Sequence, residues 1–352
     1  MYEQFDVIYS DKKEIWNSTI KNFREWDIYY LNEYINLVEI YEHAKGILLY
    51  YKEEKVEIAI VLLVKDIAED IRFKHIIPKN KYFDAETPYG YGGYLVNGVI
   101  TDSILDKFKQ YVYNWAKNQH IVSEFIRFSP FIKNKFIING KIKYLHHTIY
   151  MDTTDENIVW KNLDPKNRNM IRKAEKNAVN IIVDNGENIE EFKRIYTQTM
   201  QRLNATDYYF FDDCYYEEMI KSLKKYIKLF YAVYQGKIIG ASIFFYNDTN
   251  MHYHLSGCLT EFRHLGAMNL LIYKAALWAV EKNIRRLHLG GGITENDSLY
   301  GFKKQFNKNG VLDYFIGNNI YDDNIYNFLL DKRCEVDDTF DRNNNFLIQY
   351  RR

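Results

Sequence analysis

The sequence predicts an α/β protein with mixed sheets that is built from two tandem units. Its 352 residues suit two domains at the usual ~150 residues each, and 47% apolar residues are enough to bury a core. Each half also runs through the same series of a hairpin, a further strand, a long helix and a strand. We therefore expect domains at residues 1–152 and 153–320, and a C-terminal extension at residues 321–352 that packs back on the first domain.

In the first half, short apolar runs predict strands and one amphipathic run predicts a helix. Residues 46–51 and 57–64 are strands that the charged turn at residues 52–55 joins into a hairpin. Residues 103–119 carry apolar side chains at helical spacing, with Ser103 as the candidate N-cap. The other expected elements of this half are a helix at residues 31–43 and strands at residues 125–130 and 146–151.

In the second half, helical patterns alternate with apolar strands. Residues 228–234 and 237–247 form a hairpin over the turn Gln235-Gly236. Residues 261–282 are a long helix whose wide apolar face predicts deep packing. The other expected elements are helices at residues 189–203, 215–226 and 321–330, and strands at residues 251–257, 284–289, 311–317 and 346–350.

Charge and cysteine usage narrow the class of protein. The 47 basic and 47 acidic residues cancel, which argues against a chain whose whole surface binds DNA. The three cysteines, Cys214, Cys258 and Cys334, lie far apart and show neither a disulfide framework nor metal-ligand spacing. The chain also lacks a signal-peptide pattern and the roughly 18-residue apolar run of a transmembrane helix. We expect a cytoplasmic protein with reduced thiols and no transmembrane contact.

The stretch from His288 to Phe306 carries the densest set of chemical signals. A short strand leads into Gly290–Gly292, and three glycines suit a sharp turn or the close approach of another group. Asn296, Asp297 or Ser298 can cap the helix that follows, and this helix carries Lys303. Such an opening suits an anionic or oxygen-rich ligand. An ordinary strand-to-helix loop with a solvated lysine would give the same pattern.

Three further features have two interpretations each. Tyr89 and Tyr91 alternate with glycines, which indicates either close backbone approach beside aromatic rings or a sheet edge. Arg127 is either the solvent-side residue of an alternating strand or a guest in a pocket. Arg168 and Arg172 share one helix face in the densest basic cluster of the chain, and this face suits phosphates or is simply solvated.

Taken together, the motifs resemble the FemABX family, the aminoacyltransferases that build peptidoglycan cross-bridges within the wider GNAT acyltransferase superfamily. The resemblance covers most of residues 25–317 and implies two tandem GNAT-like domains that hold the acceptor between or across them. The motifs that carry it are Tyr253–Gly257, Arg263–Leu271, Leu289–Gly292 and Ser298–Phe306, with further likeness at residues 166–174 and 87–93.

The resemblance also implies roles for individual residues. Lys303 matches the family's lysine after phenylalanine and is expected to stabilise negative charge on the carbonyl or leaving group. The general base stays open between Asp297, Glu295 and His254, with Asp297 taken as the second catalytic residue. The expected substrate-binding residues are Tyr89, Tyr91, Arg127, Arg168, Arg172, His254, Arg263, Gly290, Gly291 and Gly292.

The implied activity is transfer of an aminoacyl or acyl group to an amino group of a cell-envelope precursor, such as a peptidoglycan stem peptide. The co-substrate is a charged tRNA or acyl-CoA, with no tightly bound cofactor and no metal. Two departures leave the donor open: the GNAT pyrophosphate loop at Arg263–Gly266 continues to Met268 where a small residue is usual, and no long coiled-coil arm is present. The alternatives are acyl-CoA-dependent acylation of an amino sugar for surface polysaccharide, and a catalytically silent saccharide or peptide binder.

Overall fold

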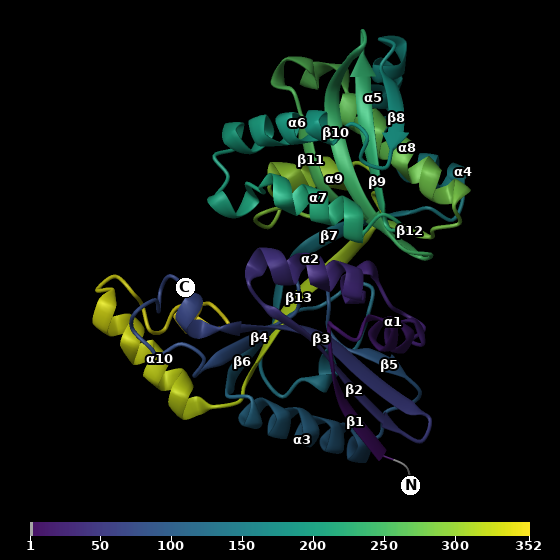
Figure 1. The fold of residues 1–352 in the computed structure, drawn as a ribbon. Coiled ribbons are helices and arrows are strands. Elements are labelled where there is room, and N and C mark those ends of the chain that lie inside the picture. Colours follow the sequence, from purple (N-terminus) through teal and green to yellow (C-terminus); the bar gives the residue numbers. More distant parts are fainter. Residues whose placement is uncertain (1–2) are drawn as a thin grey trace. The chain divides into compact units, whose positions relative to one another are not determined.

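The computed structural model describes residues 3–352, which form two compact units (Figure 1). The first unit contains the chain up to Leu145 together with Tyr314–Arg352, and the second contains His146–Asp313. Each unit combines helices with a mixed sheet, so the predicted fold class is confirmed. Residues 152 and 320, where the two predicted domains end, are the last residues of strands β7 (Ile142–Asp152) and β13 (Val311–Ile320).

The sheet of the first unit is mostly antiparallel, although β2 and β3 are its one tight hairpin among the described residues. Its order is β1-β2-β3-β4-β6-β13, with β5 added beside β3, and of the named strands within residues 3–352 only β4 and β6 run parallel. The predicted hairpin at residues 46–64 is confirmed as β2 and β3. The strands are β1 (Glu3–Tyr9), β2 (Lys45–Glu53), β3 (Val56–Asp66), β4 (Phe83–Glu86), β5 (Leu95–Asn97) and β6 (Ile121–Arg127).

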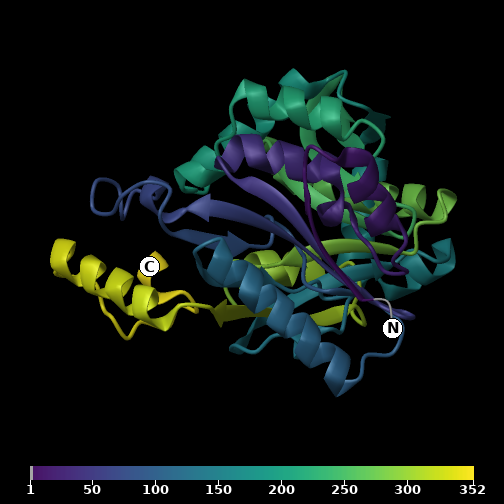
Figure 2. The same cartoon turned by 60° about the horizontal axis from the view of Figure 1, so that its bottom comes forward.

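The helices of the first unit surround this sheet. Helix α3 begins one residue before Ser103, and the Thr101 side chain accepts from Ile104 N at 3.3 Å, so the predicted cap Ser103 is wrong by two positions. In both views α10 lies beside the C-terminus (Figures 1 and 2), and Arg333 donates to the Arg352 carbonyl at 3.0 Å. The helices are α1 (Lys13–Lys21), α2 (Asn32–Glu42), α3 (Asp102–Asn118) and α10 (Asp323–Val336).

The end of the chain is tied to the sheet by buried charges. Arg351 donates to Asp84 at 2.9 Å and to Glu86 at 3.0 Å, and the Tyr350 hydroxyl donates to Asp84. The strand predicted at residues 346–350 is therefore wrong, because these residues lead into a short 3-10 turn at Gln349–Arg351 that aims side chains at the carboxylates.

The sheet of the second unit has the order β7-β12-β11-β10-β9-β8, and β11 and β12 are its one parallel pair among the described residues. The predicted hairpin over Gln235-Gly236 is confirmed as β9 and β10. The strands that lie wholly within this unit are β8 (Asn180–Asp184), β9 (Ile227–Tyr234), β10 (Lys237–Tyr246), β11 (Asn250–Cys258) and β12 (Arg286–Gly291).

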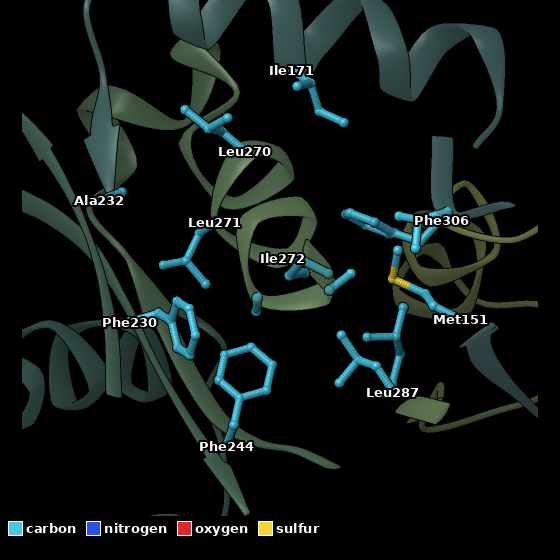
Figure 3. Packing of buried hydrophobic residues seen from close by; sticks show 14 of the residues in the cluster. Met151, Ile171, Phe230, Ala232, Phe244, Leu270, Leu271, Ile272, Leu287 and Phe306 are labelled. Carbon is cyan, nitrogen blue, oxygen red and sulfur yellow. The ribbon is translucent and has the colours of Figure 1, made fainter. Parts of the chain in front are cut away.

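Helix α8 forms the centre of the second unit's core. Figure 3 shows Leu271 of this helix facing Phe230 and Phe244 of the sheet, and all three side chains are buried. The deep packing predicted for this helix is confirmed, but it begins at Ala267, because Gly266 adopts a left-handed φ of 75° and ends the preceding 3-10 turn. The helices are α4 (Glu156–Asn162), α5 (Pro165–Lys176), α6 (Ile189–Arg202), α7 (Asp213–Ser222), α8 (Ala267–Glu281) and α9 (Ser298–Lys304).

Across residues 3–352, none of the helices has both the length and the apolar character needed to cross a membrane.

Candidate functional site

The candidate site begins where the two parallel strands of the second unit separate. β11 and β12 pair only from Asn250 opposite Arg286 to His252 opposite His288. Beyond this point β11 continues to Cys258 and β12 to Gly291 without pairing to each other. A sheet that opens between two neighbouring strands leaves backbone N–H and C=O groups of both strands available to a ligand. We call this opening the strand fork.

The glycine triplet lies at the end of the β12 arm of the fork. Gly290 has a φ of 73°, a left-handed conformation that favours glycine. A Cβ at Gly291 would lie 2.5 Å from the His146 ring, and a Cβ at Gly292 would overlap the Asp297 carboxylate. The three positions therefore need glycine for both reasons that the sequence suggested, a turn and a close approach.

Asp297 is the residue that caps α9. Its carboxylate accepts from the backbone N–H groups of Ile293 at 2.6 Å, Thr294 at 3.1 Å and Tyr300 at 2.8 Å. Burial works against its charge, but these donors hold the pKa of the carboxyl below its ordinary value. Both oxygens are engaged and the group is weakly basic, so the contacts support a structural role more than that of a general base.

Lys303 is buried, with only 8% of its surface exposed, so the interpretation as a solvated lysine is wrong. It lies on α9, and its Nζ donates to the Gly291 carbonyl at 2.7 Å. Burial lowers the pKa of this amine to about 8, although the nearby Asp297 carboxylate acts in the opposite direction. The helix thus directs a cation of reduced pKa at the end of the glycine triplet.

Two buried histidines lie at the base of the fork. His288 Nε2 lies 3.0 Å from Thr148 Oγ1, and the His288 ring meets the His252 ring edge-on at 5.6 Å. Burial, together with the charges of His252 and Lys303, lowers the pKa of His288 well below its ordinary value. His288 is therefore held in its neutral form. Neither His288 nor Thr148 was predicted as a site residue, although His288 opens the motif that contains the triplet.

His254, the other predicted base, lies farther along the β11 arm. Its ring stacks on Phe245 at 4.1 Å, and the Tyr215 hydroxyl lies 3.4 Å from its Nε2. Burial lowers the pKa of His254 to about 3. An imidazole that resists protonation is a weak proton acceptor, so these contacts suit a binding role better than a basic one.

The predicted pyrophosphate loop leads from β11 into α8. Gly266 N donates to the Arg263 carbonyl at 3.3 Å, and the Arg263 side chain is exposed. No side chain caps α8, so its first turn presents backbone N–H groups that can donate hydrogen bonds to an anion. The Met268 sulfur lies 2.8 Å from the position of a Cβ on Gly240 in β10. The bulk of Met268 is accommodated by this glycine of the sheet.

Helix α5 carries the predicted basic face. Arg172 is exposed, with its guanidinium 5.3 Å from the Trp160 ring, and Arg168 is half-buried. Among residues 3–352 neither arginine has a carboxylate in ion-pair range. Directly before Arg168 in the sequence, buried Asn167 accepts from Asn269 Nδ2 of α8 at 2.9 Å and donates to the Gln305 carbonyl at 3.2 Å. Asn167 thus connects α5 to the start of α8 and the end of α9.

The comparisons with known proteins agree on the fold. Residues 165–304 match the family model described as an acetyltransferase (GNAT) domain. The chain is similar to the crystal structure of FemX at 13% identity, with a TM-score of 0.71 over 93% of this chain and 99% of that chain. A putative lysylphosphatidylglycerol synthetase C-terminal domain from Agrobacterium fabrum aligns at 11% identity and a TM-score of 0.54, over 93% and 95% of the two chains. A tandem GNAT protein from the clavulanic acid biosynthesis pathway aligns at 8% identity and a TM-score of 0.50, over 91% of this chain and 99% of that chain. No curated protein matches the chain.

Residues 165–304 form a GNAT acetyltransferase domain, and the chain as a whole has a FemX-like fold. The matched GNAT domain contains α5, the strand fork, the start of α8, the glycine triplet and Lys303. The resemblance stated from the sequence motifs is confirmed at this level.

The first unit holds the predicted residues Tyr89, Tyr91 and Arg127. The Tyr91 ring contacts Tyr29 at 5.8 Å and Tyr314 at 5.5 Å, and the Tyr89 carbonyl accepts from the Tyr34 hydroxyl at 2.7 Å. Tyr314 was not predicted because it lies far along the chain, in β13. We call this group the tyrosine cluster.

Arg127 lies beside the tyrosine cluster. Its Nη1 donates to the Thr87 carbonyl at 2.9 Å and lies 3.6 Å from the Glu86 carboxylate. Burial raises the pKa of Tyr314 to about 12, and the positive charge of Arg127 acts against this rise. The structure supports the pocket interpretation of Arg127 over the solvent-side one.

Proposed function

We propose that this GNAT-type acyltransferase transfers an aminoacyl or acyl group to an amino group of a cell-envelope precursor, such as a peptidoglycan stem peptide. The observation that carries the proposal is the buried Lys303, held 2.7 Å from the Gly291 carbonyl at the end of one arm of the strand fork. The resemblance of the sequence motifs to FemABX aminoacyltransferases and the FemX-like fold support this acceptor class.

The reaction needs a neutral amine, a positioned carbonyl and stabilisation of the developing oxyanion. The amine nitrogen forms a bond to the carbonyl carbon, and the bond from this carbon to the oxygen of a tRNA ester or the sulfur of a thioester breaks. The amine loses a proton and the leaving group gains one. Positioning in such reactions contributes roughly 7–11 kcal/mol, and a donor at the oxyanion about 3–4 kcal/mol. We assign the second contribution to Lys303.

Proton removal from the acceptor needs no strong base in this site. Asp297 accepts three backbone N–H groups, and the pKa of His254 is about 3, so neither is well suited to take a proton. An α-amino group has an ordinary pKa of about 8 and is partly neutral near physiological pH. The acceptor can therefore enter as the free amine and lose its second proton after attack.

The phosphates of the donor fit the basic and N–H-rich part of the GNAT domain. Arg168 and Arg172 have no carboxylate in ion-pair range among the described residues, and Arg263 precedes the uncapped first turn of α8. Both a charged tRNA and acyl-CoA carry phosphates of this kind. Because Met268 packs against Gly240, the loop retains its N–H groups, and this observation favours acyl-CoA-dependent acylation of an amino sugar as the second candidate function.

The tyrosine cluster and Arg127 are proposed to bind the acceptor. Tyrosine rings offer flat apolar faces with polar edges, which suit sugars and peptides, and the guanidinium suits a carboxylate or phosphate. Glu86 and the Thr87 carbonyl hold Arg127 in place. A catalytically silent binder would use the same cluster, but it would have no need for a buried lysine at the glycine triplet.

Calorimetry with acetyl-CoA beside a nucleotide-linked peptidoglycan precursor tests the proposal. Binding of the precursor without acetyl-CoA binding supports an aminoacyl-tRNA donor and bridge formation. Tight binding of acetyl-CoA supports acyl-CoA as the donor and an amino sugar as the acceptor. Binding of a saccharide or peptide with no acyl transfer from either donor would contradict the catalytic proposal.

A further inference from the structure

Strand β8 is the last strand of the second unit's sheet and carries exposed apolar side chains. Within residues 3–352 it pairs with β9 alone. Ile182 is 41% exposed and Val183 is 43% exposed, on opposite faces of the strand. An edge strand with unpaired backbone groups and apolar side chains is a template for a further strand. The charges and bulges that normally protect such an edge are missing at these two positions.

A groove of about 630 Å³ lies beside this edge, on the face that β8 turns towards α8. Val179, Ile181 and Val183 alternate along one face of the segment and form one wall of the groove. Leu277 and Trp278 of α8 form another wall, and the Trp278 ring meets Phe230 at 6.1 Å. The groove is therefore apolar at its base and continuous with the free edge of β8.

The rim of the groove is acidic. Glu156, Glu175 and Glu281 lie on three different helices around it and are exposed. Lys274 is the single basic side chain in the lining, and its Nζ lies 3.8 Å from the Glu175 carboxylate. Lys282, the next residue after Glu281, lies just outside the lining, with its Nζ 2.9 Å from the Glu281 carboxylate. Three carboxylates against these two lysines leave one net negative charge, and exposed ion pairs of this kind are weak. The rim therefore favours a basic ligand and disfavours a second copy of the chain, which would bring two acidic rims together.

We propose that the free edge of β8 and its groove bind an extended, basic segment of a partner protein by strand addition. The backbone of the segment would pair with β8, alternate apolar side chains would enter the groove, and lysine or arginine side chains would reach the three carboxylates. This binding surface is separate from the residues assigned to acyl transfer. It gives the acyltransferase a docking point for another protein, and it does not depend on the proposed acceptor.

The probe for this surface is an acetylated and amidated heptapeptide, Lys-Val-Lys-Val-Lys-Val-Lys, carrying a fluorophore and titrated with the full chain. Two control peptides separate the contributions. The Val-Glu analogue reverses the charge, and a form N-methylated on alternate residues keeps the charge but cannot donate to the strand edge. We expect saturable binding of the first peptide and at least a tenfold loss for both controls, since each lacks one of the two interactions.

The variant Glu175→Gln/Glu281→Gln should weaken binding of the Lys-Val peptide roughly tenfold, because two rim charges are lost. Glu190→Gln/Glu191→Gln removes the same charge from α6, outside the groove lining, and should leave binding unchanged. Equal binding of the N-methylated peptide, equal effects of the two double variants, or no binding at millimolar protein would overturn the proposal. So would a dimer in sedimentation experiments that Val183→Lys dissociates, since the occupant would then be a second copy.

Discussion

Replacing Lys303 with methionine should separate catalysis from stability. The substitution keeps the length and apolar stem of the side chain but removes the cation next to the Gly291 carbonyl. Loss of one preorganised donor at an oxyanion costs about 3–4 kcal/mol, so turnover should fall about 10²–10³-fold. If Lys303 acts only in the transition state, kcat and kcat/KM should fall together.

The same variant should not lose folding stability at pH 7. Burial lowers the pKa of Lys303 from the ordinary 10.5 to about 8. This difference corresponds to about 3 kcal/mol of unfavourable free energy for the charged amine in the folded state. Methionine removes that cost but leaves the Gly291 carbonyl without its donor, which costs about 1 kcal/mol. We expect the free energy of unfolding to rise by about 2 kcal/mol.

The sign of the pH dependence follows from the lowered pKa. Below pH 8 the folded state must hold the charged amine, so the wild-type chain carries the full cost there. Between about pH 8 and 10.5 the folded state releases a proton that the unfolded state keeps, so wild-type stability rises with pH. The difference in stability between Lys303→Met and the wild type should shrink over this range.

Urea unfolding at pH 7 and pH 9.5 measures the stability, and initial rates with the donor and acceptor found by calorimetry measure turnover. Lys304→Met is the matched control, because Lys304 is the next residue of α9 and is exposed. It should change neither quantity. Normal turnover of a folded Lys303→Met would refute the catalytic assignment, and a loss of more than about 2 kcal/mol in stability would refute the account of the buried charge.

Three more predictions concern the neighbouring groups. The kcat/KM of the wild type should fall as pH rises through about 8, because Lys303 loses its proton, and the residual activity of Lys303→Met should lack this fall in a pH–rate profile. Asp297→Ala should lower the free energy of unfolding, measured by urea titration, by about 1 kcal/mol, because the N-cap of α9 is lost. Its turnover should fall far less than that of Lys303→Met, and an equal or larger fall would support Asp297 as the general base. Arg168→Ala/Arg172→Ala should weaken donor or acceptor binding in calorimetry and flatten its salt dependence, whereas unchanged binding would mean a merely solvated helix face.

Much of the fold could be predicted from local pattern. The hairpins and α8 were found because apolar periodicity and turn residues act over short distances. Errors arose where a distant contact decided the local structure. Residues 346–350 carry an apolar run that predicts a strand. In the structure the backbone forms a short 3-10 turn at Gln349–Arg351, which lets Arg351 form ion pairs with Asp84 and Glu86.

The kinds of residue that form the site could also be predicted from the sequence. The glycine triplet, the capping Asp297 and Lys303 follow one another within one strand-to-helix segment, where spacing determines neighbours. The partners supplied by other segments were not readable. Thr148 on β7 meets His288 on β12, which lies 140 positions later in the sequence, and Tyr314 of β13 contacts Tyr91. Sequence spacing carries no signal for such pairs, because sheet order determines them.

The sequence by itself determined which segments turn, cap and pack, and which residue types can bind an anion or activate a carbonyl. Only the tertiary structure decided the state of each group. Burial makes Lys303 a cation of reduced pKa instead of a solvated surface charge, and it keeps His254 and His288 neutral. The physical reason is that desolvation and long-range pairing depend on all the elements that surround a side chain, whereas propensity depends only on its neighbours along the chain.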